Sequence, residues 1–343
     1  MPRSKKQNIL YQSRLQSPKE FLRFATPEQV ADYRAKRLKC DTLVELGAGI
    51  GGQTIAFSKT CRKVIAVEID KTKTNILLQN IKKLRLKNVE VINGDALNKS
   101  VIQKISKEPI DIVFFDTERP EQTERTLAEI NPPINKILEE YSKLTKKIAI
   151  EIPPFTKDIE SLKKENDFEQ EFISLNNQLN RLTLYFDGLK TCDKSVISLP
   201  WGERLENSEK KIKIKEVVSA KNFRYLYSID PAIILANLTE ELSEKFKLNL
   251  LRLNKPVFLS TELVKSEFLV PHKVVGVPEN KFEKIVKSLK KIKAGKVILR
   301  CNVDPKDYWV VRKRYEREIT GRKEVNLFIN EKGNEAIICE RIN

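Results

Sequence analysis

One glycine-rich stretch, residues 44–52, constrains the fold of this chain more than any other feature. It reads Val-Glu-Leu-Gly-Ala-Gly-Ile-Gly-Gly, an apolar strand followed by a turn into a helix that we expect to begin near Gln53. Glycine leaves room for a ligand beside the backbone, and the first turn of the helix offers free N–H groups. The stretch predicts an α/β sheet with a nucleotide-like ligand bound beside Gly47, Gly49 and Gly51.

The residue before the turn selects between two classes of ligand. Gly47, Gly49 and Gly52 match the G-x-G-x-x-G fingerprint of dinucleotide-binding enzymes, so a nicotinamide or flavin enzyme is one interpretation. Glu45 favours another ligand, because its carboxylate would repel a pyrophosphate but attract a molecule with ammonium and sulfonium groups. S-adenosylmethionine is such a molecule, and a nicotinamide-dependent oxidoreductase remains the alternative.

Two further carboxylates follow at the ends of expected strands. The strand at residues 63–68 ends in Glu68, about twenty residues after the turn, where a carboxylate can accept hydrogen bonds from both ribose hydroxyls. The strand at residues 89–92 leads to Asp95, which could accept from the adenine amino group, and to Ala96, which could offer its backbone N–H. Together these residues favour S-adenosylmethionine as the cofactor.

These motifs carry a resemblance to known families. Residues 25–95 resemble a class I S-adenosylmethionine-dependent methyltransferase, and Thr26-Pro27-Glu28 with residues 66–70 are similar to the trimethylguanosine synthase branch, the RNA cap guanine-N2 methyltransferases. Residues 225–236 and 300–317 resemble the later signatures of methyltransferases that carry a C-terminal THUMP-like domain. The resemblance implies a Rossmann-like seven-stranded sheet, a small C-terminal α+β THUMP-like domain, and methylation of a structured RNA with guanine N2 as the leading acceptor.

The same resemblance implies where the chemistry takes place. In this fold the end of the fourth strand, here residues 110–115, faces the transferable methyl group, and it is followed by Asp116 and Arg119. We expect Asp116 to accept a hydrogen bond from the nucleophilic amine and Arg119 to hold a phosphate or a base edge. Thr117 stands where the THUMP-like family has proline. Residues 131–134, Asn-Pro-Pro-Ile, match an amino-methylation motif in letters, but we interpret them as the start of a helix.

The order of expected elements predicts the domain organisation. Strands alternate with helices from residue 41 to residue 152, which is typical of a parallel sheet with helical crossovers. The expected parts are a basic N-terminal arm and helix, the methyltransferase domain, a connecting segment and the THUMP-like domain, at residues 1–40, 41–200, 201–271 and 272–343.

Positive charge gathers at both ends of the chain. The formal net charge is +17, from 64 Lys and Arg against 47 Asp and Glu, and residues 1–40 and 240–343 carry most of the excess. A polyanion-binding protein concentrates such charge on the surface that meets its partner, although a solvated Lys-rich surface is the plainer interpretation. We expect a basic helix at residues 305–317 to bind the substrate RNA through Arg312, Lys313, Arg314 and Arg317.

Other classes of protein are disfavoured by what the sequence contains. The five cysteines are isolated and never spaced as C-x-x-C, so we expect neither disulfides nor a bound metal, and the single histidine, His272, is interpreted as structural. The amino end lacks the apolar segment of a secretory signal, and no long apolar run suits a membrane span, which predicts a cytoplasmic protein. The competing functions are a nucleic-acid-binding protein whose cofactor site does not turn over and a methyltransferase acting on a substrate other than RNA. The sequence does not predict an oligomeric state.

Overall fold

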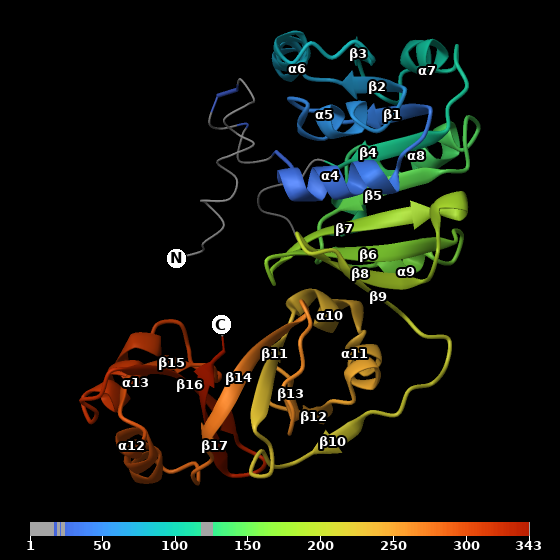
Figure 1. Cartoon of the computed structure of the whole chain (residues 1–343). Coiled ribbons are helices and arrows are strands. Elements are labelled where there is room, and N and C mark those ends of the chain that lie inside the picture. Colours follow the sequence, from blue (N-terminus) through green and yellow to red (C-terminus); the bar gives the residue numbers. More distant parts are fainter. Residues whose placement is uncertain (1–16, 19–20, 22–24, 118–125, 343) are drawn as a thin grey trace. The chain divides into compact units, whose positions relative to one another are not determined.

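The chain forms two compact units. The computed structural model describes residues 17–18, 21, 25–117 and 126–342 (Figure 1). The first unit comprises Met1–Gly202 and the second Glu203–Asn343. Each unit has its own sheet and its own core.

The first unit is built on a mixed sheet in which five neighbouring strands are parallel and the next is antiparallel to them. Four of the five parallel strands are almost entirely buried, because helices cover both faces of a parallel sheet. The sheet exceeds the seven strands that the sequence predicted, since β8 adds to it parallel to β6. Its strands follow the order β3 (Val89–Asn93), β2 (Lys63–Glu68), β1 (Thr42–Leu46), β4 (Ile112–Asp116), β5 (Ile148–Ile152), β7 (Leu179–Phe186), β6 (Phe168–Leu175), β8 (Lys194–Leu199), β9 (Glu203–Glu206).

Helices of the first unit connect and cover these strands, as Figure 1 shows. Asp70 caps one of them, α6, with a side-chain oxygen that accepts from two backbone N–H groups. Phe57 of α5 packs edge-on against Phe114 of β4, with ring centroids 5.4 Å apart, in a fully buried cluster. The helices are α4 (Glu28–Arg37), α5 (Gly52–Ser58), α6 (Lys71–Lys83), α7 (Lys99–Ile105), α8 (Ile134–Tyr141) and α9 (Ile159–Leu162), with short 3₁₀ turns at Leu127–Glu129 and Asp187–Leu189.

The second unit contains a mainly antiparallel sheet with two apolar clusters. Its strands follow the order β10 (Lys215–Val217), β12 (Asn249–Leu251), β13 (Val257–Ser260), β11 (Tyr225–Ile229), β14 (Leu269–Gly276), β17 (Glu335–Arg341), β16 (Lys323–Asn330), β15 (Ala294–Leu299). The helices of this unit are α10 (Pro231–Ala236), α11 (Thr239–Phe246), α12 (Phe282–Lys291) and α13 (Tyr308–Glu316).

This architecture corrects the predicted connecting segment at residues 201–271. That segment supplies strands of the same sheet that continues through β14, since β11 pairs with both β13 and β14. The strands are only three to five residues long, so their periodicity is too brief to be recognised without their partners.

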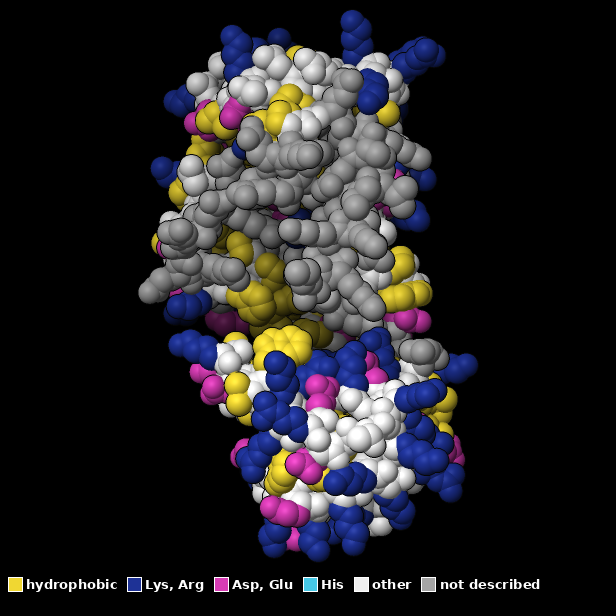
Figure 2. Space-filling model, turned by 90° about the vertical axis from the view of Figure 1, so that its left-hand side faces the viewer, with side chains coloured by type: hydrophobic (Ala, Val, Ile, Leu, Met, Phe, Trp, Pro, Cys, Tyr) yellow, Lys and Arg dark blue, Asp and Glu magenta, His cyan; other side chains and the backbone are white. Residues whose placement is uncertain are grey.

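In the part of the chain that the structure describes, no helix combines the length and apolar character that a membrane crossing requires. Figure 2 shows many Lys and Arg side chains on the drawn face of the second unit.

Candidate functional site

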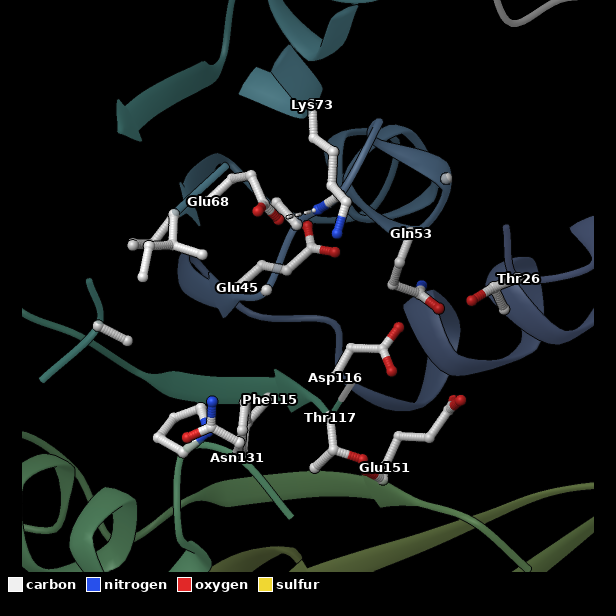
Figure 3. Close-up of a pocket in the computed structure, with 18 of the residues that line it drawn as sticks. Thr26, Glu45, Gln53, Glu68, Lys73, Phe115, Asp116, Thr117, Asn131 and Glu151 are labelled. Atoms are coloured by element: carbon white, nitrogen blue, oxygen red, sulfur yellow. Dashed lines mark hydrogen bonds between the residues drawn. The ribbon is translucent and has the colours of Figure 1, made fainter. Parts of the chain in front are cut away.

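A pocket of about 780 Å³ opens in the first unit at the carboxyl ends of the parallel strands (Figure 3). Ligands of open parallel sheets bind at this edge. Seven of the residues that the sequence singled out line the pocket, namely Glu45, Gly47, Gly49, Glu68, Asp95, Ala96 and Asp116. The predicted site is therefore one continuous cavity, apart from two residues. Arg119 lies outside the described residues, and Gly51 does not line the pocket.

Glycine occupies the positions of this turn for different structural reasons. Gly47 has φ +78°, and a Cβ there would lie 2.6 Å from the backbone oxygen of Asp116, so glycine lets the turn approach the end of β4. Gly51, with φ +95°, precedes α5, and its Cβ would lie 2.5 Å from Leu77 Cδ1 of α6. Gly51 therefore faces α6, and its predicted contact with the cofactor stays a prediction.

Glu68 fixes the turn to the neighbouring strand. Its carboxylate accepts from the backbone N–H of Gly49 at 2.7 Å through Oε2 and from that of Asp70 at 2.9 Å through Oε1. The residue is 4% exposed and still lines the pocket. Each oxygen keeps a second lone pair, so the carboxylate can hold the turn and accept from a ligand hydroxyl as well.

Glu45 is a buried carboxyl group at the floor of the pocket. It is 1% exposed, and Thr54 donates a hydrogen bond to Oε2 at 2.6 Å. Burial raises the pKa of Glu45 to about 8; the Thr54 hydrogen bond opposes this rise, and the nearby carboxylate of Asp116 adds to it. A cationic group in the pocket would favour the ionised form. In Figure 3 the Lys73 side chain also extends toward this space.

The loop after β3 is held in place by its own hydrogen bonds. Asp95 accepts from the backbone N–H of Leu97 at 2.9 Å, and the Tyr141 hydroxyl of α8 donates to the Ala96 carbonyl oxygen at 2.8 Å. Asp95 is exposed and Ala96 half-buried at the pocket wall. The loop can thus present a carboxylate and a backbone N–H to an adenine ring.

The pocket that Asp116 lines also borders a buried polar network that was not predicted from the sequence. Arg34 of α4 is fully buried and forms an ion pair with Glu151 at the end of β5, and it donates to Gln53 at 2.8 Å. Arg181 of β7 pairs with the same glutamate at 2.6 Å. These residues come from separate elements, so no local pattern could have indicated their meeting.

Thr117, which stands where the THUMP-like family has proline, hydrogen-bonds to a residue of this network. Its hydroxyl donates to the Glu151 carbonyl oxygen at 2.8 Å, and the residue is 5% exposed. The hydrogen bond connects the segment after β4 to the end of β5. Thr117 therefore holds the backbone beside Asp116 without the rigid ring of proline.

Residues 131–133 also line the pocket, which the sequence analysis did not expect. Pro133 precedes α8, so the predicted helix start is confirmed. The same pocket that Asp116 lines is nevertheless also lined by Asn131, Pro132 and Pro133. Asn180 lines it too, and its side-chain oxygen is buried with no hydrogen-bond partner among the described residues. The Asn-Pro-Pro motif was the sequence feature that could have indicated residues 131–133 as part of the site.

The predicted RNA-binding residues lie on and just after α13 of the second unit. Arg312 pairs with Glu316 at 2.9 Å and lies over the Trp309 ring, 5.1 Å from its centroid. Arg314 lies over the Phe282 ring at 4.2 Å. Lys313 and Arg317 are exposed, as is Trp309. The helix therefore presents both charge and an aromatic surface.

Comparison with known sequences supports a methyltransferase. Residues 7–149 match the sequence profile of the ribosomal RNA adenine dimethylase family. The probable ribosomal RNA small subunit methyltransferase A of Methanosphaera stadtmanae is 47% identical over 57 residues, which are 17% of this chain and 21% of the relative. The probable cobalt-precorrin-6B C(15)-methyltransferase of Methanococcus vannielii is 35% identical over 74 residues, 21% of this chain and 41% of the relative. The chain thus spans about a fifth of the first relative and two fifths of the second.

Comparison with solved structures extends over both units. A crystal structure of a candidate methyltransferase from Porphyromonas gingivalis W83 covers 95% of this chain and 83% of its own, with a TM-score of 0.77 and 15% identity. At that identity the likeness shows the fold alone. The matches to methyltransferase sequences fall within the first unit, and the chain shares the fold of a candidate methyltransferase, while the THUMP-like character of the second unit stays a prediction.

Proposed function

We propose that this chain is an S-adenosylmethionine-dependent methyltransferase that modifies a base of a structured RNA. The observation that carries the proposal is one pocket that joins three carboxyl groups suited to the cofactor, those of Glu45, Glu68 and Asp95, to the carboxylate of Asp116. The RNA part is supported by the match to ribosomal RNA adenine dimethylases and by the basic, aromatic helix α13. The cytoplasmic location predicted from the sequence belongs with this proposal.

The residues of the pocket fit the cofactor by their chemistry. Glu45 is buried with a raised pKa, so a cationic amino group beside it would stabilise its ionised form. Glu68 and Asp95 offer acceptors for the ribose and the adenine, and the glycine turn leaves space at the backbone. When bound, the cofactor would supply an electrophilic methyl group.

The chain's own residues then have to orient the acceptor. Methylation of an amine proceeds by in-line attack of the nitrogen lone pair, so positioning and removal of a proton are the main demands on the protein. We assign Asp116 to accept a hydrogen bond from that amine, and we assign Asn131 and Asn180 to the acceptor side because both line the pocket. Arg119, which lies outside the described residues, is proposed to hold a phosphate or a base edge.

The acceptor base is the finer part of the proposal. Guanine N2 follows from the resemblance to trimethylguanosine synthases, whereas the family whose profile matches is named for the dimethylation of adenine. Both bases carry an exocyclic amine, and a carboxylate with an amide oxygen nearby suits either. We therefore propose an exocyclic amine of a purine as the acceptor.

Labelled methyl transfer tests this proposal. The full chain is incubated with methyl-labelled S-adenosylmethionine and, in separate reactions, with unmodified RNA, DNA and protein, and the labelled product is digested to nucleosides. We expect label in N-methylated guanosine or adenosine from RNA. Label only in DNA, in protein or in a small molecule would identify a substrate other than RNA. Tight cofactor binding with no label anywhere would favour a nucleic-acid-binding protein whose site does not turn over.

A further inference from the structure

A second pocket, of about 470 Å³, lies in the second unit at the amino ends of β15 and β16. It is formed where the chain leaves α12 and where it enters β16. Its lining is strongly basic and contains no aromatic side chain: Lys290, Lys293, Ala294, Thr320, Gly321, Arg322 and Lys323. No residue of α13, the helix predicted from the sequence to bind RNA, lines this pocket.

Two backbone segments cross directly beneath this pocket and fix its shape. The N–H of Gly321 donates to the Ala294 carbonyl oxygen at 2.9 Å, and the N–H of Arg322 donates to that of Lys293 at 3.2 Å. A Cβ at Gly321 would lie 1.9 Å from the Lys293 oxygen, and one at Gly295 would lie 2.0 Å from the Gly321 oxygen. The crossing therefore requires glycine on both segments, and it holds the backbones of Lys293 and Arg322 side by side.

The charge of the pocket is only partly balanced within the protein. Lys290 lies 3.7 Å from Glu318, and Lys323 pairs with Glu340 at 2.8 Å. In the described ranges, no carboxylate lies within ion-pair distance of Lys293 or Arg322, and both side chains are exposed. Cations gathered in one hollow repel one another, so an anion that enters it is favoured.

A solvated lysine face explains only part of this arrangement. Lys290 is in the last turn of α12, where a cation complements the helix dipole whatever else it does. Lys293 and Arg322, in contrast, come from two loops far apart in the sequence, and the glycine crossing brings them together. An arginine beside lysines is well suited to a phosphate group, because its planar fork can donate two parallel hydrogen bonds.

We propose that this pocket binds a backbone phosphate of the RNA substrate, with Lys293 and Arg322 as the main donors. The proposal rests on the RNA part of the proposed function. The absence of aromatic lining favours a phosphate over a stacked base at this place, whereas Trp309 on α13 offers a stacking surface. Contacts of this kind position an RNA without reading its sequence.

The test compares the double variant Lys293→Ala/Arg322→Ala with the matched control Lys255→Ala/Lys265→Ala in the full chain. The control removes the same charge from exposed loops that flank β13, and four strands separate β13 from β15 in the sheet. Far-ultraviolet circular dichroism and thermal unfolding check that both variants fold. The probes are inorganic pyrophosphate, followed by titration calorimetry, and an unmodified structured RNA, followed over a range of salt concentrations.

We expect saturable pyrophosphate binding by the wild type and the control, and a loss of about tenfold or more in the Lys293/Arg322 variant. The negative slope of log K against log salt for RNA should become shallower by about one in that variant and stay unchanged in the control. Equal losses in the two variants, or no pyrophosphate binding by the wild type, would overturn the proposal. Loss of pyrophosphate binding with unchanged RNA affinity would overturn the RNA assignment and point to a small phosphorylated ligand. The pyrophosphate result is independent of methyl transfer, so it separates this proposal from the proposed function.

Discussion

The carboxylate of Glu68 accepts a hydrogen bond from the backbone N–H of Gly49 at 2.7 Å, so the end of β2 holds the glycine turn that follows β1. The same carboxylate lines the pocket and is in reach of a ligand there. One side chain thus shapes the turn and is available for recognition. Its replacement should affect both roles, and a suitable pair of variants can separate them.

Glu68→Ala should weaken binding of S-adenosylhomocysteine by about tenfold or more, because hydrogen bonds to a charged group contribute roughly 1.5–3 kcal/mol. Glu68→Gln keeps the shape and one acceptor, so it should retain the fold and lose less affinity. Calorimetry measures both. The control is Glu90→Ala, which replaces an exposed glutamate of β3 that pairs with Lys63 of β2; it should bind normally. Unchanged affinity in both Glu68 variants would remove this residue from the cofactor site.

Gly47→Ala and Gly49→Ala should differ sharply although both residues have positive φ. At Gly47 the added Cβ would meet the Asp116 carbonyl oxygen at 2.6 Å, so the ends of β1 and β4 must move apart. At Gly49 no described atom lies within 4 Å of the added Cβ, and only backbone strain of about 1 kcal/mol is expected. Thermal unfolding and cofactor titration should show a severe defect in Gly47→Ala and a mild one in Gly49→Ala. Equal effects would mean that the close approach to Asp116 is unimportant.

Binding of S-adenosylmethionine at pH 7 should release about one proton from Glu45. Burial raises the pKa of this carboxyl to about 8, so it is mostly protonated in the free protein, and an adjacent ammonium group should ionise it. Calorimetry in two buffers of different ionisation enthalpy measures the release. Glu45→Gln should release none and bind more weakly. Equal proton release by wild type and variant would show that the proton comes from another group.

The free energy of unfolding provides a second check on Glu45. The folded protein binds a proton at this site below about pH 8, whereas the unfolded chain does so only near the ordinary value of 4.5. Stability from this site therefore increases as the pH falls from about 8 toward 4.5, by roughly 1.4 kcal/mol per pH unit. Glu45→Gln should lack this component when the two proteins are compared by denaturant unfolding. Parallel pH profiles of wild type and variant would contradict the raised pKa.

Joint replacement of Arg312, Lys313, Arg314 and Arg317 by alanine should weaken RNA binding by about tenfold or more and reduce its salt dependence. Cofactor binding in the first unit should be unchanged. Lys313 and Arg317 should account for most of the charge effect, because Arg312 already pairs with Glu316. Filter binding at several salt concentrations measures both quantities. Full RNA affinity in the fourfold variant would mean that this helix is a solvated surface.

The sequence allowed prediction of those parts of the site that depend on strand ends. Glu45, Glu68, Asp95 and Asp116 each end or follow an apolar strand, and parallel strands bring such positions to one edge. Their meeting in one pocket follows from topology alone. Gly51 is the exception among the glycines, since it does not line the pocket and an added Cβ there would meet Leu77 of α6, which the local sequence does not indicate.

The remaining features depend on contacts between distant elements. Arg34, Glu151 and Arg181 meet from α4, β5 and β7, and nothing in the local sequence of any one indicates the others. The basic pocket of the second unit has the same origin, because the crossing at Gly295 and Gly321 joins two separate loops. Short strands such as β12 and β13 are recognisable only once they are paired.

The most direct test of the central claim is methyl transfer by Asp116→Asn under saturating cofactor. If chemistry takes place at the end of β4, this variant should bind S-adenosylmethionine as the wild type does. It should transfer label to unmodified RNA more slowly than the wild type by a factor of about a hundred or greater. The control is Asp32→Asn, which replaces a half-buried aspartate of α4 that pairs with Lys59 and does not line the pocket; it should transfer normally. Undiminished transfer by Asp116→Asn, or no transfer by a wild type that binds the cofactor, would contradict the account.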